Sequence, residues 1–201
     1  MKQFKFYYPL EPFSITQKFG ENLSPIYAQL GLKGHTGWDA VRRDNKGNFL
    51  AVTGANVRAA HNGEITHAGA DGATGYIVVV RTTEQFLDIS GNPYYWKTVY
   101  AHLLPNIPVK VGMKVKVGDI IGYADTTGYA TGPHLHLTIK PIYQGESDWI
   151  WANVEQNNGY LGAVDPTPYS AGQSAYNVMT AGQKLKQLWP WIYEKYYLPN
   201  I

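Results

Sequence analysis

Three short patterns hold four of the chain's six histidines and place a carboxylate beside them. They are the pair His35 and Asp39, the isolated His102, and the pair His134 and His136. A hydrolytic zinc ion needs three protein ligands, an open position for water, and nearby groups that accept and donate protons. Four imidazoles and one carboxylate supply that number, so the sequence predicts a zinc site that performs hydrolysis.

The most informative local pattern contains His134 and His136. Side chains at positions i and i+2 of a strand point to the same face, so a strand over His134–Lys140 would turn both imidazoles to one side. Its apolar face would pack into a core while the imidazoles face an open groove. The two faces are His134, His136, Thr138 and Lys140 against Leu135, Leu137 and Ile139.

His35 and Asp39 lie four positions apart in a glycine-rich stretch. A helix would also bring such positions together, but Gly34 and Gly37 disfavour a helix. The pattern therefore predicts a turn that runs into a strand. Asp39 offers the negative charge that helps a cation leave its hydration shell, and imidazoles combined with a carboxylate suit zinc.

The remaining histidines are less informative one by one. His102 ends the β-prone run Trp96–His102, and an unperturbed pKa of about 6.5 suits a proton shuttle. His61 and His67 flank Gly63 in a predicted hairpin and have no carboxylate pattern beside them. We therefore predict structural roles for these two.

The composition narrows the class of protein. A length of 201 residues suits one domain with its own core. Charged residues at 16%, with 21 glycines and 16 tyrosines, indicate a turn-rich β protein. The net charge of +2 permits weak attraction to an anionic surface but does not predict nucleic-acid binding. Because cysteine is absent, nitrogen and oxygen ligands must hold any metal.

Short β-prone runs separated by glycine, asparagine and proline fill the middle of the chain. No helical crossovers lie between them, which favours an antiparallel sheet. Residues 83–96 form a long connection, which we interpret as either a hairpin extension that walls a cleft or a solvated loop. The predicted strands are Val57–Ala60, Glu64–Ala68, Tyr76–Thr82, Tyr95–His102, Asp119–Ala124 and His134–Lys140.

The composition changes after Pro141. Residues 143–170 predict an irregular segment with a rigid turn at Asp165–Pro168. The segment Leu185–Leu198 is rich in tryptophan and tyrosine, and Pro190 interrupts any helix there. We predict that these aromatics dock on their own domain; the alternative is that they bind a wall polymer, a partner or a lipid interface.

The sequence shows no membrane-directed segment. The first nine residues lack an apolar core of signal-peptide length. The longest apolar run, Tyr76–Val80, is too short to cross a bilayer. We therefore predict a soluble chain with no transmembrane segment and no encoded export signal.

Five stretches of the chain resemble the lysostaphin-type, or LytM-like, zinc endopeptidases. They occur in the order found in that family and extend over roughly residues 10–141, about two thirds of the chain. A single histidine pair would be a weak signal, but the ordered set is highly specific. The stretches are Gly34–Asp39, Val57–Ile65, Val99–Leu103, Val109–Gly122 and Thr127–Leu137.

The resemblance implies an all-β fold with minor α structure, of the lysostaphin/LytM-like duplicated hybrid-motif type. In that fold an antiparallel sheet forms the floor of a narrow groove. The resemblance implies one Zn²⁺ ion held by His35, Asp39 and His136, with water in the fourth position. It assigns His102 and His134 to the pair that activates water, stabilises the oxyanion and protonates the leaving amine.

The implied activity is zinc-dependent hydrolysis of cross-links or stem peptides in bacterial peptidoglycan, which lyses or remodels the cell wall. Tyr27 or Tyr100 would add a hydrogen bond to the transition state. Residues 1–141 are expected to form the catalytic domain, and residues 142–201 an aromatic-rich extension packed on or appended to it. The substrate lies outside the cytoplasm, so we expect a monomer that is released as a phage endolysin, carried on a virion, or exported by other means.

Three other functions fit parts of the sequence. A catalytically inactive wall-binding or amidase-activating module on the same fold would lose metal ligands, yet all five polar positions are intact. A lipoyl- or biotinyl-type carrier would explain the hairpin at Val109–Gly122, but it needs a lysine at a tight exposed turn and leaves the histidines unexplained. A carboxypeptidase or amidase acting on wall peptides would keep the zinc and change the reaction.

Overall fold

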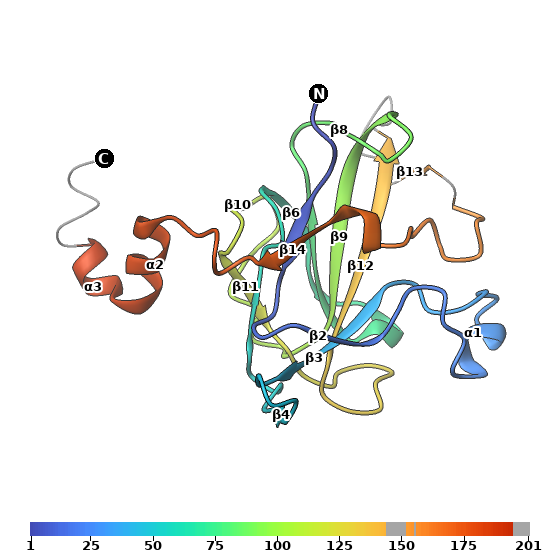
Figure 1. Ribbon diagram of the computed structural model, residues 1–201, viewed down its shortest axis with the longest axis horizontal. Coiled ribbons are helices and arrows are strands. Elements are labelled where there is room, and N and C mark those ends of the chain that lie inside the picture. The colour runs from blue at the N-terminus through green and yellow to red at the C-terminus, as the bar shows by residue number, and fades with distance from the viewer. Residues whose placement is uncertain (144–151, 155, 195–201) are drawn as a thin grey trace.

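The computed structural model describes residues 1–143, 152–154 and 156–194. A large antiparallel sheet runs through its centre, and its two longest strands lie side by side (Figure 1). In spatial order the strands are β10 (Lys114–Val115), β6 (Gly63–Ala70), β7 (Tyr76–Arg81), β9 (Pro93–Leu103), β12 (Leu135–Tyr143), β3 (Trp38–Arg43) and β2 (Ser14–Gln17).

Shorter elements extend and cover this sheet. Three two-residue strands pair with its members: β4 (Phe49–Leu50) with β3, β8 (Phe86–Leu87) with β9, and β13 (Ala152–Asn153) with β12. Two small sheets pair β5 (Asn56–Arg58) with β11 (Ile120–Tyr123) and β1 (Phe6–Tyr8) with β14 (Ser170–Ser174). The helices are α1 (Ile26–Gln29), α2 (Ala181–Leu188) and α3 (Pro190–Ile192), with 3₁₀ turns η1 (Gly72–Thr74) and η2 (Thr167–Tyr169).

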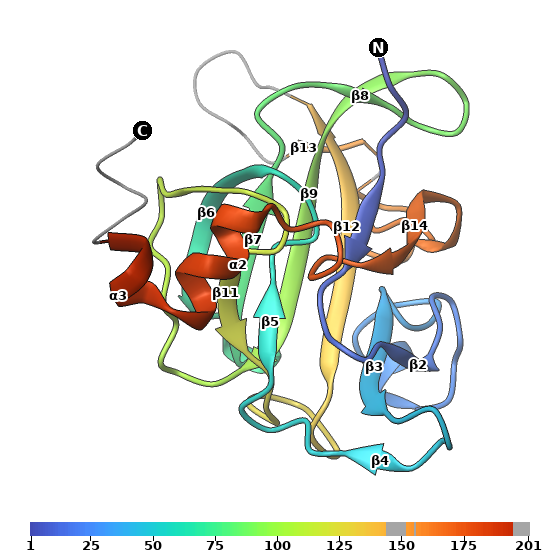
Figure 2. The same ribbon diagram turned by 60° about the vertical axis from the view of Figure 1, so that its left-hand side comes forward.

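One face of the sheet supports the core, and the other carries the groove. Figure 2 shows β1, β5 and β11 in front of the long strands, where they cover the apolar face. Leu135, Leu137 and Ile139 of β12 are fully buried there. The alternation predicted for His134–Lys140 is therefore confirmed, and it leaves the opposite face of β12 to polar side chains.

The predicted strands and their antiparallel pairing are confirmed, with two differences. The runs predicted at Val57–Ala60 and Asp119–Ala124 correspond to β5 and β11, which form a separate two-stranded sheet over the core instead of joining the large one. Strand β12 continues through Pro141 to Tyr143, whereas the predicted strand ended at Lys140. Strand β3 pairs only with residues 135–137 of β12, so it needs no backbone donor from position 141. Proline, which lacks an N–H group, is therefore tolerated there.

Residues 83–96 fold as a hairpin extension, because β8 pairs antiparallel with the start of β9. Phe86 lies opposite Tyr94, and Trp96 donates its Nε1 hydrogen to the Phe86 carbonyl oxygen at 3.3 Å. This hairpin therefore packs onto the core through its aromatic side chains. Other segments line the cavity described below, so the hairpin does not form its wall.

His61 is a structural residue, as predicted. Its ring is buried edge-on against Phe4, with ring centroids 5.4 Å apart. Its Nδ1 donates to the Asn62 carbonyl oxygen at 2.8 Å, and its Nε2 lies 3.1 Å from the Thr98 hydroxyl. Burial lowers the pKa of His61 to about 4, so the folded protein holds it neutral.

We expect His61 to weaken the fold as the pH falls from about 6.5 to about 4. In this window the unfolded chain binds a proton at His61 and the folded protein does not, so acid favours unfolding. A shift of this size corresponds to roughly 3 kcal/mol. Urea unfolding at about pH 7 and about pH 4.5 should therefore show a smaller acid loss for His61→Gln than for the wild type. Equal losses of stability in acid for the two proteins would contradict the assignment of His61 as a buried neutral residue.

The C-terminal helices attach through polar contacts. Thr180 and Gln183 form a capping box at the start of α2, and Gln183 also donates to the Val117 carbonyl oxygen at 2.9 Å. Proline at the first position of α3 breaks the helix, as predicted. However, Trp189 and Trp191 are 52% and 63% exposed, so these aromatics do not dock on the domain. The tyrosines at 196 and 197 lie outside the described residues.

Within the described residues, no helix is both long enough and apolar enough to cross a membrane.

Candidate metal centre

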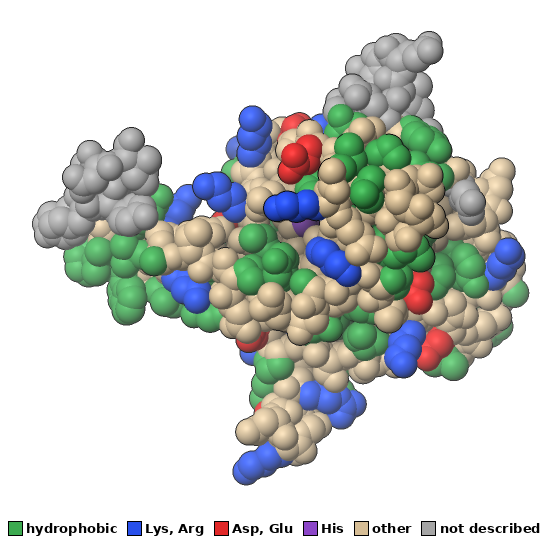
Figure 3. Space-filling view, turned by 45° about the horizontal axis from the view of Figure 1, so that its top comes forward, with side chains coloured by type: hydrophobic (Ala, Val, Ile, Leu, Met, Phe, Trp, Pro, Cys, Tyr) green, Lys and Arg blue, Asp and Glu red, His purple; other side chains and the backbone are tan. Residues whose placement is uncertain are grey.

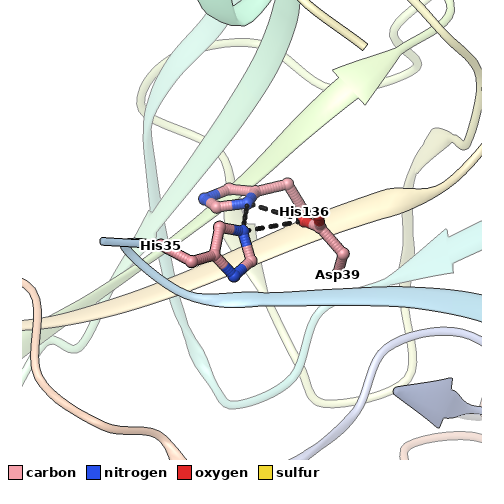
Figure 4. A group of neighbouring side chains, drawn as sticks. All are labelled: His35, Asp39 and His136. Atoms are coloured by element: carbon pink, nitrogen blue, oxygen red, sulfur yellow. Dashed lines mark hydrogen bonds and ion pairs between the residues drawn. The ribbon is translucent and has the colours of Figure 1, made fainter. Parts of the chain in front are cut away.

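His35, Asp39 and His136 meet at one point, where β3 pairs with β12 (Figure 4). Asp39 and His136 occupy directly opposite positions of the two strands, and His35 comes from the turn before β3. The Asp39 Oδ1 atom lies 3.0 Å from His35 Nε2 and 2.9 Å from His136 Nδ1. The two nitrogens are themselves 2.9 Å apart.

The turn that carries His35 depends on Gly37. A Cβ atom at this position would lie 2.2 Å from the carbonyl oxygen of Leu137 on β12, well inside van der Waals contact. Glycine therefore permits the turn to approach β12 closely enough for His35 to reach His136. The prediction of a turn that runs into a strand is confirmed, because β3 begins at Trp38.

Two further contacts orient the imidazoles. His35 donates from Nδ1 to the Lys18 carbonyl oxygen at 3.1 Å. A carbonyl oxygen only accepts, so the proton sits on Nδ1 and the Nε2 lone pair points at the centre. His136 Nε2 lies 2.8 Å from the Thr138 hydroxyl, and donation to that oxygen leaves Nδ1 available as a ligand.

The charges of the cluster suit a cation. Burial raises the pKa of Asp39, but its close contacts with the His136 and His35 nitrogens outweigh burial and hold this pKa well below its usual range. Burial lowers the pKa of His136, although the Asp39 carboxylate opposes that effect. These shifts favour an ionised carboxylate at Asp39 and a neutral imidazole at His136, the protonation states that metal ligands require.

The donor set and spacing fit zinc. Tetrahedral zinc with bonds of about 2.0–2.2 Å separates its ligand atoms by roughly 3.3–3.5 Å. The three atoms here are 2.9–3.0 Å apart, so a small outward movement of each side chain admits the ion. Two nitrogens and one oxygen also match the three protein ligands of catalytic zinc sites.

His102 and His134 lie beside this cluster and outside it. Their ring centroids are 4.6 Å apart, and His134 Nε2 is 3.5 Å from Asp39 Oδ1. His102 donates from Nδ1 to the Thr127 carbonyl oxygen at 2.7 Å, and His134 from Nδ1 to the Gly132 carbonyl oxygen at 2.8 Å. In both rings the proton therefore sits on Nδ1, and the Nε2 atom is available to accept a proton.

The backbone of His102 is strained. Its φ angle is +61°, in the left-handed region that residues other than glycine adopt uncommonly. The pairing of β7 with β9 shifts register at this point, which marks a bulge. Burial lowers the pKa of His102 to about 4, so the ring is a neutral base at neutral pH.

The two tyrosine candidates lie in different places. Tyr100 faces the core, where its hydroxyl accepts from the Ala60 amide at 2.8 Å. Burial raises its pKa to about 12, and the prediction of a role at the site is wrong for this residue. Tyr27 of α1 lies near the cluster: its ring centroid is 6.0 Å from that of His35. Gln17 donates to its hydroxyl at 2.8 Å.

A cavity of about 430 Å³ opens beside the cluster on the polar face of the sheet. His67, for which the sequence predicted a structural role, lies in its wall, and its Nε2 is buried without a hydrogen-bond partner. The lining residues are Thr36, Thr66, His67, Asp71, Thr74, Ile77, Val79, Lys97, Val99, His136, Thr138, Lys140 and Leu161.

The chain belongs to peptidase family M23. The model of that family matches residues 43–148, which include His102, His134 and His136, whereas His35 and Asp39 precede the matched range. Strand pairing between β3 and β12 brings the two parts together. The resemblance to lysostaphin-type enzymes is therefore confirmed, and one solved structure of similar fold is described as a zinc-containing peptidase.

Curated relatives support the same family. The DD-carboxypeptidase/endopeptidase Mpg of Neisseria meningitidis is 33% identical over 132 residues, which are 66% of this chain and 25% of that protein. The glycyl-glycine endopeptidase ALE-1 of Staphylococcus capitis is 37% identical over 90 residues, 45% of this chain and 22% of that protein. The chain thus spans about a quarter of the length of these relatives.

Solved structures share the fold. The catalytic domain of lysostaphin from Staphylococcus simulans has a TM-score of 0.51 and 24% identity, over 78% of this chain and 91% of that one. LytU has a TM-score of 0.52 and 26% identity, over 79% and 85%. A zinc-containing peptidase of Vibrio cholerae has a TM-score of 0.51 and 26% identity, over 69% and 37%. The all-β antiparallel fold expected from the sequence is confirmed.

Proposed function

We propose that this protein is a zinc-dependent endopeptidase that hydrolyses peptide cross-links or stem peptides of bacterial peptidoglycan. The observation that carries the proposal is the convergence of one carboxylate and two imidazoles beside two further histidines with available Nε2 atoms. The names of the relatives support the reaction type, because Mpg and ALE-1 are both described as endopeptidases.

His35, Asp39 and His136 would hold the zinc ion through Nε2, a carboxylate oxygen and Nδ1. When bound, zinc acidifies a water molecule and polarises the scissile carbonyl group. His102 and His134 would handle the protons: one accepts a proton from the attacking water at Nε2, and this proton passes through the pair to the leaving amine, while the charged ring stabilises the developing oxyanion. The contacts to Thr127 and Gly132 hold each ring in the tautomer that these steps need.

We further propose that residues 1–141 carry catalysis and that residues 142–201 form an extension packed on the same domain. Two contacts support this arrangement. Strand β14 pairs with β1, and Lys140 Nζ donates to the Leu161 carbonyl oxygen at 2.7 Å. Because peptidoglycan lies outside the cytoplasm, we propose that the protein acts on the wall after release as a phage endolysin, on a virion, or after export by other means. We also propose that it acts as a monomer.

Mass spectrometry of digested peptidoglycan tests the proposed function. Purified walls of two cross-link types are incubated with the zinc-loaded protein, with and without a chelator. We expect fragments with a new peptide amine that disappear with the chelator and return when zinc is added back. Release of a single terminal amino acid would instead identify a carboxypeptidase. If neither wall yields fragments while zinc is bound, the endopeptidase proposal fails.

A further inference from the structure

Two lysines lie opposite each other on the cavity floor, away from the metal centre. Lys140 of β12 and Lys97 of β9 are directly paired positions, and both line the cavity that His136 also lines. The row continues across the sheet: Arg81 of β7 lies opposite Lys97, and Glu64 of β6 lies opposite Arg81. Arg81 and Glu64 form an ion pair at 3.4 Å. Three cations thus follow one another across three neighbouring strands.

This pairing of lysines differs from the way in which other Lys and Arg side chains are spread over the surface. On the face drawn in Figure 3, Lys and Arg side chains are scattered among polar and apolar ones. Lys97 and Lys140, in contrast, occupy opposite positions, where side chains of neighbouring strands lie about 4.5–5.5 Å apart at Cβ and like charges repel. Lys140 Nζ donates to the Leu161 carbonyl oxygen at 2.7 Å, and an anion that binds at these paired positions would also offset the repulsion between the two charges.

Both lysines remain largely charged at neutral pH. Burial lowers the pKa of each to about 8, and for Lys97 the neighbouring charge of Lys140 contributes to this shift. Asp71 lines the same cavity and favours the charged form of Lys140. It is the single carboxylate among the described lining residues, so the lysines outnumber it.

A second polar group faces the same floor. His67 of β6 lies in a row with Val79, Val99 and Thr138, one step from the row of lysines toward the metal centre. Its Nε2 atom is buried without a hydrogen-bond partner, and His67 lines the cavity. A buried polar atom of this kind usually finds a partner, so a ligand that lies on the floor would supply one.

The position of the lysines sets the distance to the reacting bond. Lys140 follows His136 by four residues on the same strand and the same face, which is about 13 Å at roughly 3.3 Å per residue. An extended peptide advances by a similar amount per residue. A group held by the lysines therefore lies about three or four residues from the bond at the metal centre.

We propose that Lys97 and Lys140 form a subsite that binds a free carboxylate of the substrate peptide, three or four residues from the scissile bond. The proposal rests on the proposed peptidase function and adds a preference within it. Peptidoglycan peptides carry free carboxylates, and some cell walls convert them to carboxamides. The subsite would thus favour the acidic form of the wall over the amidated form.

Binding tests the subsite without relying on cleavage. The probes are two synthetic stem tetrapeptides that differ in one group, a glutamate-derived carboxylate or its carboxamide. Isothermal titration calorimetry with the zinc-loaded wild type should show about tenfold or tighter binding of the carboxylate form, the effect of one charge-assisted hydrogen bond. Lys97→Gln and Lys140→Gln should bind both forms alike, whereas Lys140→Arg should keep the preference. Equal binding of both forms by the wild type would overturn the proposal.

Cleavage and a control variant complete the test. Lys114→Gln removes the same charge from an exposed position on β10 and should leave the preference for the carboxylate form unchanged. If Lys114→Gln lost the preference as well, net charge would explain the effect and the subsite would be overturned. We would then measure kcat and KM for cross-linked peptides in the carboxylate and carboxamide forms. We expect the two forms to differ in KM. If the wild type binds the carboxylate form selectively but cleaves neither peptide, the subsite stands and the endopeptidase function fails.

Discussion

Asp39→Ala is expected to yield a folded protein without bound zinc and without peptidase activity. Asp39 supplies the negative charge of the cluster and contacts both imidazole ligands, at 3.0 Å and 2.9 Å. Its removal leaves His35 and His136 as the two remaining ligands of the cluster. The loss of zinc affinity should exceed the 10–100-fold that is typical when an outer hydrogen-bond partner is removed. Metal content after dialysis, measured by inductively coupled plasma mass spectrometry, checks this.

Two comparisons sharpen the result. Thr138→Val removes the hydroxyl that contacts His136 Nε2 at 2.8 Å and keeps all three ligands, so it should weaken zinc binding by about 10–100-fold. Glu84→Ala removes an exposed carboxylate far from the cluster in sequence and should bind zinc like the wild type. His35→Ala and His136→Ala should behave like Asp39→Ala. Stoichiometric zinc in Asp39→Ala would remove this residue from the ligand set.

The sequence predicted the parts of the site that follow from local periodicity. Alternation along His134–Lys140 placed the imidazoles on one face and the leucines in the core, because a strand has a period of two residues. Glycine at position 37 predicted a turn, since a helix tolerates glycine poorly. Both features depend on a few neighbouring residues, so they can be recognised without knowledge of the fold.

Long-range contacts could not be predicted in the same way. The pairing that places Asp39 opposite His136 joins residues almost a hundred positions apart, and the family resemblance alone linked them. The partner of His35 Nδ1 is the main-chain carbonyl of Lys18, which no side-chain pattern marks. The tryptophans of the C-terminal segment remain exposed because α2 attaches through glutamine side chains. Composition alone favoured apolar docking.

His102 shows why alternation fails at an irregular position. Counted from the groove-facing residues Lys97 and Val99, the residue at position 102 would face the core with Tyr100. The bulge in β9 and the φ angle of +61° reverse this and turn the ring toward His134. Bulges often redirect a side chain beside an active site, and the sequence carries no clear sign of this one.

Zinc-loaded His102→Ala and His134→Ala are expected to retain the metal and to lose activity by roughly 10²–10⁴-fold, the usual contribution of a positioned acid or base. Neither side chain belongs to the three-residue cluster. Because His102 has a positive φ angle, His102→Asn is the better control, since asparagine accepts this backbone and cannot act as the base. Full activity in either zinc-loaded His102 variant would remove that residue from the mechanism.

The double variant distinguishes a cooperating pair from two independent groups. The rings lie 4.6 Å apart, and each is fixed by one main-chain carbonyl. If one ring accepts the proton while the other stabilises the charge formed in the same step, loss of either disables that step. Removing both should then cost little more than removing one, because residues that act as a unit are not additive. Steady-state kcat/KM of the wild type, both single variants and the double variant, all zinc-loaded, measures this. Additive losses would show that the two histidines act in separate steps, with one serving the attack of water and the other the departure of the amine.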